Sequence, residues 1–222
     1  MAKVNQSVIG KLSGKLGDLV FRQINGKTFV STRPKNYKPT KSKKAISNRN
    51  SFSQINLFAS TINKNETLKQ IWQTAKIDAL SAYTKITKTN LKLSLNDGIN
   101  IKNIIVPKSK LFTYIIISLN KSDLKISCYK NSFDKIVNPK NNFQCVVLLF
   151  FSQPRQKGII QYRASLFEVN EFIIDKDKIV FDLKSAIDKS YKKVVIFNTF
   201  IISIENKIKN WSSTTANEFL FE

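Results

Sequence analysis

The stretch "FQCVVLLFFSQ", residues 143–153, holds seven consecutive apolar side chains and no charged residue. A second stretch, "KKVVIFNTFIISIE" at 192–205, has a similar apolar centre. Both are much shorter than the roughly 20 apolar residues that a membrane-spanning helix needs. They have the length of buried β-strands, so we expect strands in the second half of the chain and no membrane partner.

The sequence around these two stretches, from Leu111 onward, alternates with a period of two and is interrupted often by turn residues. Turn signals occur at 120–123, 138–139, 154–158 and 175–177. Strand candidates cover 112–120, 124–130, 143–153, 158–169, 178–184 and 192–205, with a seventh at 214–222. Short strands at this spacing predict an antiparallel, immunoglobulin-like β-sandwich over residues 111–222.

The clearest local element near the N-terminus is "DLVFRQINGKTFVSTR", residues 18–33. Asn25-Gly26 provides the two positive-φ positions of a type I′ turn, so we expect a β-hairpin. The expected pairs are Ile24 with Lys27, Arg22 with Phe29, Phe21 with Val30, and Asp18 with Arg33. One face would carry Leu19, Phe21 and Val30, and the other Arg22, Lys27 and Phe29. A hairpin alone is marginally stable, so its apolar face needs a packing partner.

An extended basic arm is expected after the hairpin, because "PKNYKPTKSKK" (34–44) has two prolines and no acidic residue. From about Ser42 the apolar residues recur at helical spacing, and Asn65 is a suitable N-cap for a second helix ending near Asn90. Residues 95–110 are expected to form short strands and turns. The predicted fold is therefore α+β: an N-terminal β-hairpin with a basic arm (1–50), a helical hairpin with connecting strands (51–110), and the antiparallel sandwich (111–222).

Charge distinguishes the two halves of the chain, whose formal net charge is +22. Residues 1–110 contain 21 basic and 4 acidic side chains, against 16 and 11 in residues 111–222. An AT-rich coding bias accounts for the lysines but not for the six glutamates, since Glu codons are equally AT-rich. The asymmetry points to a polyanionic partner for the first half.

The basic residues concentrate in one N-terminal cluster, opposed only by Asp18. The candidate nucleic-acid-binding residues are Lys11, Lys15, Arg22, Lys27, Arg33, Lys35, Lys38, Lys41, Lys43, Lys44 and Arg49, with Tyr37 as an aromatic that could stack on a base. Eight lysines and three arginines suit phosphate contacts better than base reading. Two alternatives stay open: a solubilising segment, and an arm that lies across a neighbouring subunit and adds a strand to its sheet.

Signals for catalysis are weak. "GKLSGKLGD" (10–18) resembles a phosphate-binding loop, but Gly10 and Gly14 are one residue too close, Leu16 replaces the required hydroxyl, and a hairpin follows. The chain has no histidine, which excludes histidine-based catalysis and histidine metal ligands. Cys128 and Cys145 are too few for a zinc site and are expected to be reduced, buried thiols, with a disulfide as the alternative if they lie on adjacent strands. We therefore expect no enzymatic activity, no metal and no cofactor.

The segment 10–35 resembles the N-terminal signature of a family of uncharacterised bacterial proteins of about 200 residues, in which a Ser-Gly-Lys-x-Gly stretch precedes a Val-Phe strand, a Gly-Lys turn and an Arg-Pro-Lys exit. The matching positions are Ser13, Gly14, Lys15, Gly17, Val20, Gly26, Lys27, Arg33, Pro34 and Lys35. "LKQIWQTAK" (68–76) and "KNWSST" (209–214) are similar too. The resemblance implies a two-part helical and β-rich layout and no catalytic residue.

Together these patterns predict a non-enzymatic binding protein whose N-terminal region contacts a polyanion, nucleic acid in the first place, without sequence specificity. The alternative is a structural subunit of a phage-like particle or another large assembly, with the N-terminal arm engaging neighbouring subunits. The N-terminus lacks the apolar stretch of a signal peptide. The expected location is therefore the cytoplasm, or a particle assembled there.

Overall fold

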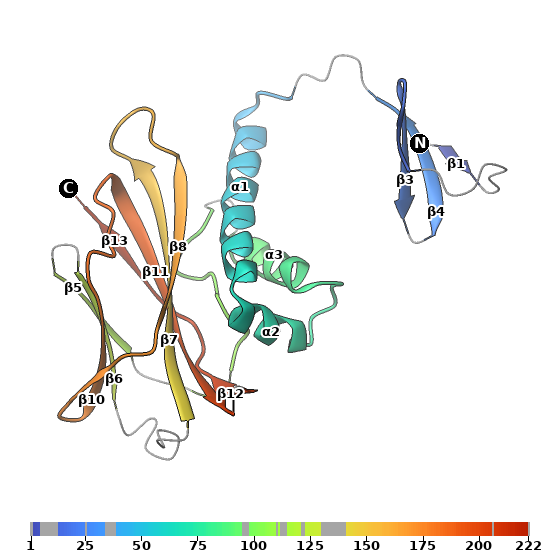
Figure 1. Ribbon diagram of the computed structural model, residues 1–222. Helices are drawn as coiled ribbons and strands as arrows, with labels where there is room; N and C mark the ends of the chain where they lie inside the picture. The colour runs from blue at the N-terminus through green and yellow to red at the C-terminus, as the bar shows by residue number, and fades with distance from the viewer. Residues whose placement is uncertain are drawn as a thin grey trace. The chain divides into compact units, whose positions relative to one another are not determined.

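The chain forms two compact units, residues 1–42 and residues 43–222 (Figure 1). The computed structural model describes residues 2–4, 13–24, 26–33, 39–94, 98–109, 111, 115–120, 123–129, 141–205 and 207–221. The division differs from the expected boundaries at 50 and 110. Residues 43–50 belong to the first helix, and the helices share a compact unit with the strands that follow.

The N-terminal unit is a four-stranded antiparallel sheet with strand order β1-β4-β3-β2. Its strands are β1 (Ala2–Val4), β2 (Gly14–Leu16), β3 (Leu19–Ile24) and β4 (Lys27–Thr32). β3 and β4 pair with Ile24 opposite Lys27 and Phe21 opposite Val30, the register that a two-residue connection requires. β1 and β2 extend this hairpin on both sides.

Three helices begin the second unit: α1 (Lys43–Lys64), α2 (Glu66–Thr74) and α3 (Ala82–Ser94). Asn65 caps α2 as expected, because its side-chain oxygen accepts a hydrogen bond from the backbone amide of Leu68 at 2.8 Å. The predicted helical hairpin is corrected to three helices, since the chain leaves the helix at Ala75, which is extended.

Two local features end α2 and restart the chain as α3. The Lys85 ammonium group donates to the carbonyls of Gln73 and Ala75 at 2.8 and 2.6 Å, satisfying groups at the end of α2. Ser81 and Thr84 then exchange hydrogen bonds between side chains and backbone amides, in the manner of a capping box. The chain therefore forms two helices, α2 and α3, where the apolar spacing predicted one continuous helix.

The strands of the second unit form two antiparallel sheets packed face to face. One sheet has the order β5-β6-β10-β9, and the other β12-β11-β7-β8, with β13 also paired to β11. The strands are β5 (Ile115–Asn120), β6 (Asp123–Tyr129), β7 (Asn141–Pro154), β8 (Tyr162–Val169), β9 (Ile173–Asp175), β10 (Lys178–Leu183), β11 (Tyr191–Ile204), β12 (Lys207–Trp211) and β13 (Thr215–Leu220). The predicted antiparallel sandwich is thus present, and β9 and β12 are additional to the expected strands.

The long strands β7 and β11 separate two hydrophobic cores. Val146, Leu148 and Phe150 of β7 pack against the helices, whereas Val147 and Leu149 pack against the facing sheet. Strand residues alternate between faces, so a strand buried on both sides has to be apolar throughout. This explains the uninterrupted apolar run at 145–151. The unit has three layers: helices, the β7–β11 sheet, and the β6–β10 sheet (Figure 1).

Residues 98–109 connect the helices to the sandwich without forming a strand, which corrects the expectation of short strands there. Hydrogen bonds of the Asn103 side chain take the place of strand pairing in this segment. Its side-chain amide donates to the Asn90 backbone carbonyl and to the Ser94 hydroxyl, at 3.1 and 2.8 Å. Side chains therefore satisfy the polar groups of this irregular segment.

Candidate nucleic-acid interface

Three of the predicted basic side chains lie on one face of the N-terminal sheet. The paired positions are Lys15 with Val20, Arg22 with Phe29, and Lys27 with Ile24. Directly opposed residues point to the same face, and residues two apart along a strand share that face. Arg22 therefore lies opposite Phe29, Lys27 lies two residues before Phe29 on β4, and Lys15 lies on the same face one strand beyond Arg22; all three cations are exposed. We name this set of four the basic face.

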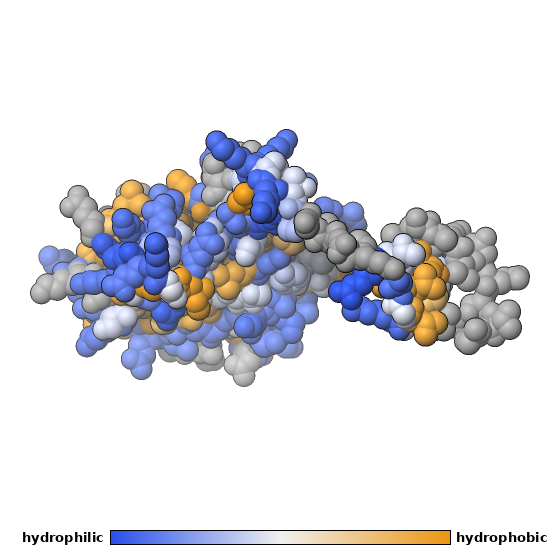
Figure 2. All heavy atoms as spheres, turned by 90° about the horizontal axis from the view of Figure 1, so that it is seen from above, coloured by the Kyte–Doolittle hydropathy of each residue, from blue (hydrophilic) through white to orange (hydrophobic). Residues whose placement is uncertain are grey.

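The opposite face of the same sheet is apolar. Leu16 is 70% exposed and Leu19 is 37% exposed, and the side chains of Phe21 and Val30 on this face are half-buried. In the N-terminal unit, hydrophobic residues gather on one side and hydrophilic residues on another (Figure 2). The three cations thus lie on one face of the sheet, together with Val20 and the exposed Ile24, and Leu16 and Leu19 lie on the other.

A second group of predicted residues lies at the start of α1. Lys41 precedes the helix, Lys43 and Lys44 occupy its first turn, and Arg49 follows, with all four side chains exposed. The first turn contains no acidic residue. Backbone amides already make a helix N-terminus positive, so lysines there are electrostatically unfavourable and an anion would relieve the repulsion.

The remaining candidates divide by whether the structure describes them. Arg33 follows β4 directly; its side chain is exposed, and its backbone amide donates to the Asp18 carbonyl at 2.8 Å. The others lie outside the described residues: Lys11, Lys35, Tyr37 and Lys38.

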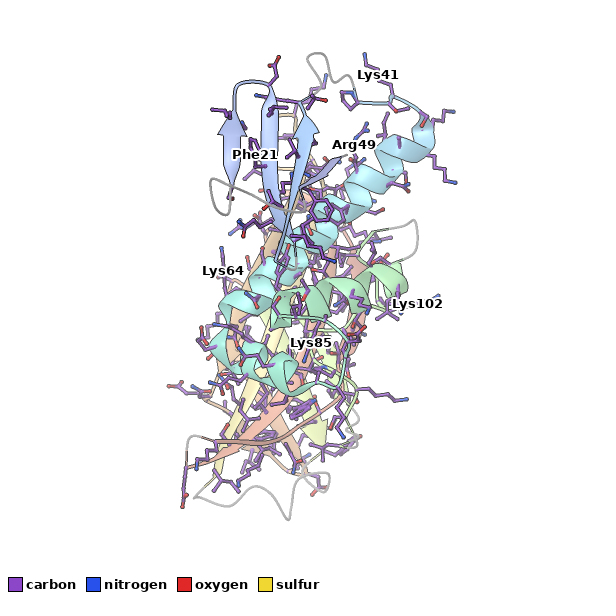
Figure 3. All side chains as sticks on the ribbon, turned by 90° about the vertical axis from the view of Figure 1, so that its right-hand side faces the viewer. Phe21, Lys41, Arg49, Lys64, Lys85 and Lys102 are labelled. Carbon is purple, nitrogen blue, oxygen red and sulfur yellow. The ribbon has the colours of Figure 1, made fainter. Side chains whose placement is uncertain are left out.

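The helical layer adds basic residues beyond the N-terminal cluster. Residues 43–94 and 98–109 carry 11 basic and 2 acidic side chains. Figure 3 shows Lys64, Lys85 and Lys102 on the helical side of this unit. Exposed lysines of the layer beyond Arg49 are Lys64, Lys76, Lys88, Lys92, Lys102 and Lys108. Lys64, Lys88 and Lys92 lie on helices and the other three on connections, so they are not clustered in sequence, and only the charge count of the first half signalled them.

Some of these lysines interact with groups of the protein. Lys85 donates to the end of α2, and Lys88 donates to the Asp78 carbonyl at 2.6 Å. Lys69 pairs with Glu66 at 3.0 Å. Some lysines of this layer therefore bind groups of the protein itself and contribute to its structure.

Both cysteines are buried in the core between the two sheets. Burial raises the pKa of the Cys128 thiol to about 12. Burial, together with the neighbouring Cys128, raises the pKa of Cys145 well above its ordinary value. The thiolate is the reactive and metal-binding form, so neither thiol is suited to nucleophilic chemistry at neutral pH.

The carboxylates of Glu66 and Glu168 are among the groups that line a polar cavity of about 510 Å³. Glu168 is engaged: its two carboxylate oxygens accept hydrogen bonds from the side-chain amides of Asn65 and Gln144. Asp175 and Asp177 are exposed in the β9–β10 turn. Among the described residues, no group of three or more acidic or cysteine side chains is placed to hold a metal ion.

The comparisons with known proteins leave the family open. No family model and no curated protein matches the chain. Among solved structures, it is similar to the chicken interferon gamma receptor alpha chain, with 7% identity, a TM-score of 0.29, and 50% of this chain and 51% of that chain covered. It is also similar to superoxide reductase from Nanoarchaeum equitans, with 15% identity, a TM-score of 0.25, and 50% and 93% covered.

This chain therefore spans about half of the receptor chain that it matches. Both TM-scores are too low to carry a functional argument. In the described part of the chain, no helix is long and apolar enough to cross a membrane.

Proposed function

We propose that this protein is a non-enzymatic nucleic-acid-binding protein whose N-terminal region contacts the polyanion without sequence specificity. The basic face carries the proposal: Lys15, Arg22 and Lys27 share one face of the sheet with the half-buried Phe29, which Arg22 and Lys27 neighbour directly. Cations beside an aromatic ring on a sheet suit phosphates and stacked bases, which occur in every nucleic acid. The lysines at the start of α1 add to the same electrostatic preference.

Salt dependence gives the sharpest test of this proposal. Duplex binding weakens with salt by a slope of about 0.9 per phosphate contact, because neutralised phosphates release counterions. We therefore expect the triple variant Lys15→Gln, Arg22→Gln, Lys27→Gln to flatten the slope by about 2 to 3. The measurement is fluorescence anisotropy of a labelled duplex across a salt series, on nuclease-treated protein.

A matched control removes three exposed lysines from the sandwich: Lys125→Gln, Lys157→Gln and Lys184→Gln. This variant has the same net charge as the test variant but keeps the basic face. An equal loss of slope in both variants would show that net charge alone drives binding and would overturn the assignment of the site.

A structural subunit is the second candidate, and the apolar face of the N-terminal sheet favours it. Leu16 and Leu19 are exposed there, as a surface that seats against a neighbouring subunit would require. Light scattering at low and high salt separates the two functions. A large particle that survives nuclease and high salt supports assembly, whereas a particle that forms only with added nucleic acid supports binding.

We also propose that the sandwich is immunoglobulin-like. Numbered along the chain, β5-β6-β10-β9 and β12-β11-β7-β8 correspond to the A-B-E-D and G-F-C-C′ orders of such domains, which supports the proposal. The family resemblance of residues 10–35 and the cytoplasmic location stay predictions.

A further inference from the structure

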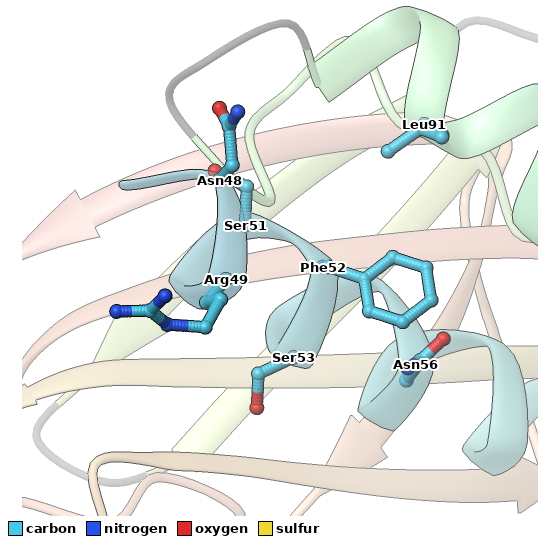
Figure 4. A pocket seen from close by; sticks show the side chains of 7 residues that line it. All are labelled: Asn48, Arg49, Ser51, Phe52, Ser53, Asn56 and Leu91. Atoms are coloured by element: carbon cyan, nitrogen blue, oxygen red, sulfur yellow. The ribbon is translucent and has the colours of Figure 1, made fainter. Parts of the chain in front are cut away.

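An open hollow of about 830 Å³ lies on the outer side of α1, between its N-terminal half and α3 (Figure 4). Asn48, Phe52 and Asn56 line it from α1, and Leu91 lines it from α3. The three α1 residues follow one another at intervals of four, which places them on one stripe of the helix. The hollow therefore has an aromatic ring at its centre and an amide on each side.

Phe52 is not used in the core. Its side chain is 51% exposed, whereas Ile55, Phe58 and Ile62 of the same helix are fully buried against the sheet. Leu91 is also exposed, at 44%. The residues that anchor α1 in the core thus lie on another stripe of the helix. The Phe52 ring is exposed and can contact a ligand.

The polar groups of the hollow suit a planar ligand with hydrogen-bonding edges. The Tyr83 hydroxyl donates to the Asn56 side-chain oxygen at 3.2 Å, which orients the amide of Asn56. Its amide nitrogen is then a donor at the margin of the hollow, and Asn48 supplies a second amide. Amide side chains of this kind bind the exposed edges of unpaired bases.

The surroundings of the hollow favour a negatively charged ligand. Arg49 is among the lining residues, with its guanidinium group directed away from the Phe52 ring (Figure 4), and the exposed Lys92 follows Leu91 directly in α3. The helical layer around it carries 11 basic and 2 acidic side chains over residues 43–94 and 98–109. A ring that stacks bases, beside cations that bind phosphates, is the combination found in single-strand binding proteins.

We infer that this hollow holds one unpaired base of a single-stranded nucleic acid, stacked on Phe52, with a neighbouring phosphate on Arg49. The inference rests on the proposed function and adds to it a second contact surface, on the second unit, and a preference for single strands. A duplex keeps its bases paired and stacked, so it can meet the cations but cannot fill the hollow.

The test compares the full chain with Phe52→Ala, using a labelled oligothymidylate of about 15 nucleotides and a mixed-sequence duplex of equal length. Loss of one stacking contact should weaken single-strand binding about fivefold or more and leave duplex binding unchanged. Phe52→Tyr keeps a stacking ring and should bind as the unaltered chain does. Leu80→Ala removes a fully exposed apolar side chain of the same layer and should have no effect.

The outcomes separate this inference from the proposed function. If the unaltered chain binds neither probe, both fail. If it binds both and Phe52→Ala weakens both or neither, the stacking site is wrong while nucleic-acid binding stands. If Phe52→Ala changes only the molar mass measured by light scattering, the hollow is a protein contact and the inference is overturned.

Discussion

The two units of this protein use their charged and polar side chains differently. In residues 43–222, Lys85 completes the end of α2, and Asn103 satisfies the polar groups of an irregular connection. In residues 1–42, Lys15, Arg22 and Lys27 are exposed together on one face of a sheet. The smaller unit thus gathers three cations on one face of a sheet, while the larger unit, which also exposes lysines, uses Lys85 and Asn103 for stability.

The apolar side chains show the same contrast. The second unit buries aromatic residues in two separate cores, whereas the first leaves Leu16 and Leu19 exposed on one face of its sheet. The residues proposed to bind nucleic acid therefore differ from those that form the cores, so mutations should affect binding and stability separately.

The largest effect expected is on the helical core. Phe58 is fully buried, with its ring edge-on to Phe197 at 5.1 Å and to Phe150 at 6.3 Å between centroids. Phe58→Ala should lower the free energy of unfolding by about 3–5 kcal/mol, because it removes buried area and leaves a cavity. Urea denaturation followed by tryptophan fluorescence measures this change.

Phe58→Ala also tests whether the two units are energetically independent. Amide chemical shifts of residues 19–32 should stay the same in Phe58→Ala, because these residues belong to the other unit. Shifts spread over both units would show that they are energetically coupled.

A smaller effect of opposite sign is expected between the two sheets. Asn198 is fully buried on β11, where strand alternation places it between Ile196 and Phe200 in the inter-sheet core. Within the described part of the chain, its side-chain nitrogen and oxygen have no hydrogen-bond partner. Asn198→Leu keeps a similar volume and should raise the free energy of unfolding by about 1–3 kcal/mol.

The urea midpoint of Asn198→Leu, with the salt dependence of duplex binding as its control, measures this effect. A lower midpoint would mean that an internal water satisfies the amide and that the core requires it.

The smallest effect is a dependence of stability on pH. Burial alone would raise the pKa of Asp188, but hydrogen bonds from Ser190 and the nearby Arg163 outweigh it and lower the pKa below its ordinary value. Arg163 contacts the Asp188 carboxylate at 2.6 Å. A lowered pKa in the folded state stabilises the protein above the ordinary aspartate range, and this contribution disappears as pH falls through the folded-state pKa.

Asp188→Asn should therefore lower stability near neutral pH by less than about 1 kcal/mol, as for other exposed ion pairs. Urea midpoints measured from neutral to acidic pH should converge for the two proteins. A constant difference across that range would assign the effect to packing instead of charge.

The sequence predicted those features that depend on neighbouring residues. Two-period alternation located most strands of the sandwich, and Asn65 identified the start of α2. The break after α2 was not predicted, since Ala75, Ala79 and Ala82 fit a continuous apolar stripe. The break depends on contacts between Lys85 and carbonyls 10 and 12 residues earlier, which periodicity does not reveal.

The candidate site was predicted unevenly for a similar reason. Alternation from the expected turn placed Arg22, Lys27 and Phe29 together, but adding Lys15 required the pairing of β2 with β3. The hollow around Phe52 was missed because its lining comes from two helices. In sequence, Phe52 fitted the apolar stripe of α1 as well as Phe58 did, and only the burial of each ring distinguishes them.

The two tryptophans of the chain have a practical consequence. The Trp72 indole donates to the Ile105 carbonyl at 2.8 Å, and the Trp211 indole donates to the Pro107 carbonyl at 3.0 Å. One comes from the helical layer and the other from the sandwich, so both hold the same short connection. Intrinsic fluorescence therefore reports mainly on this junction, and a change in emission would signal separation of the helices from the sandwich before either layer unfolds.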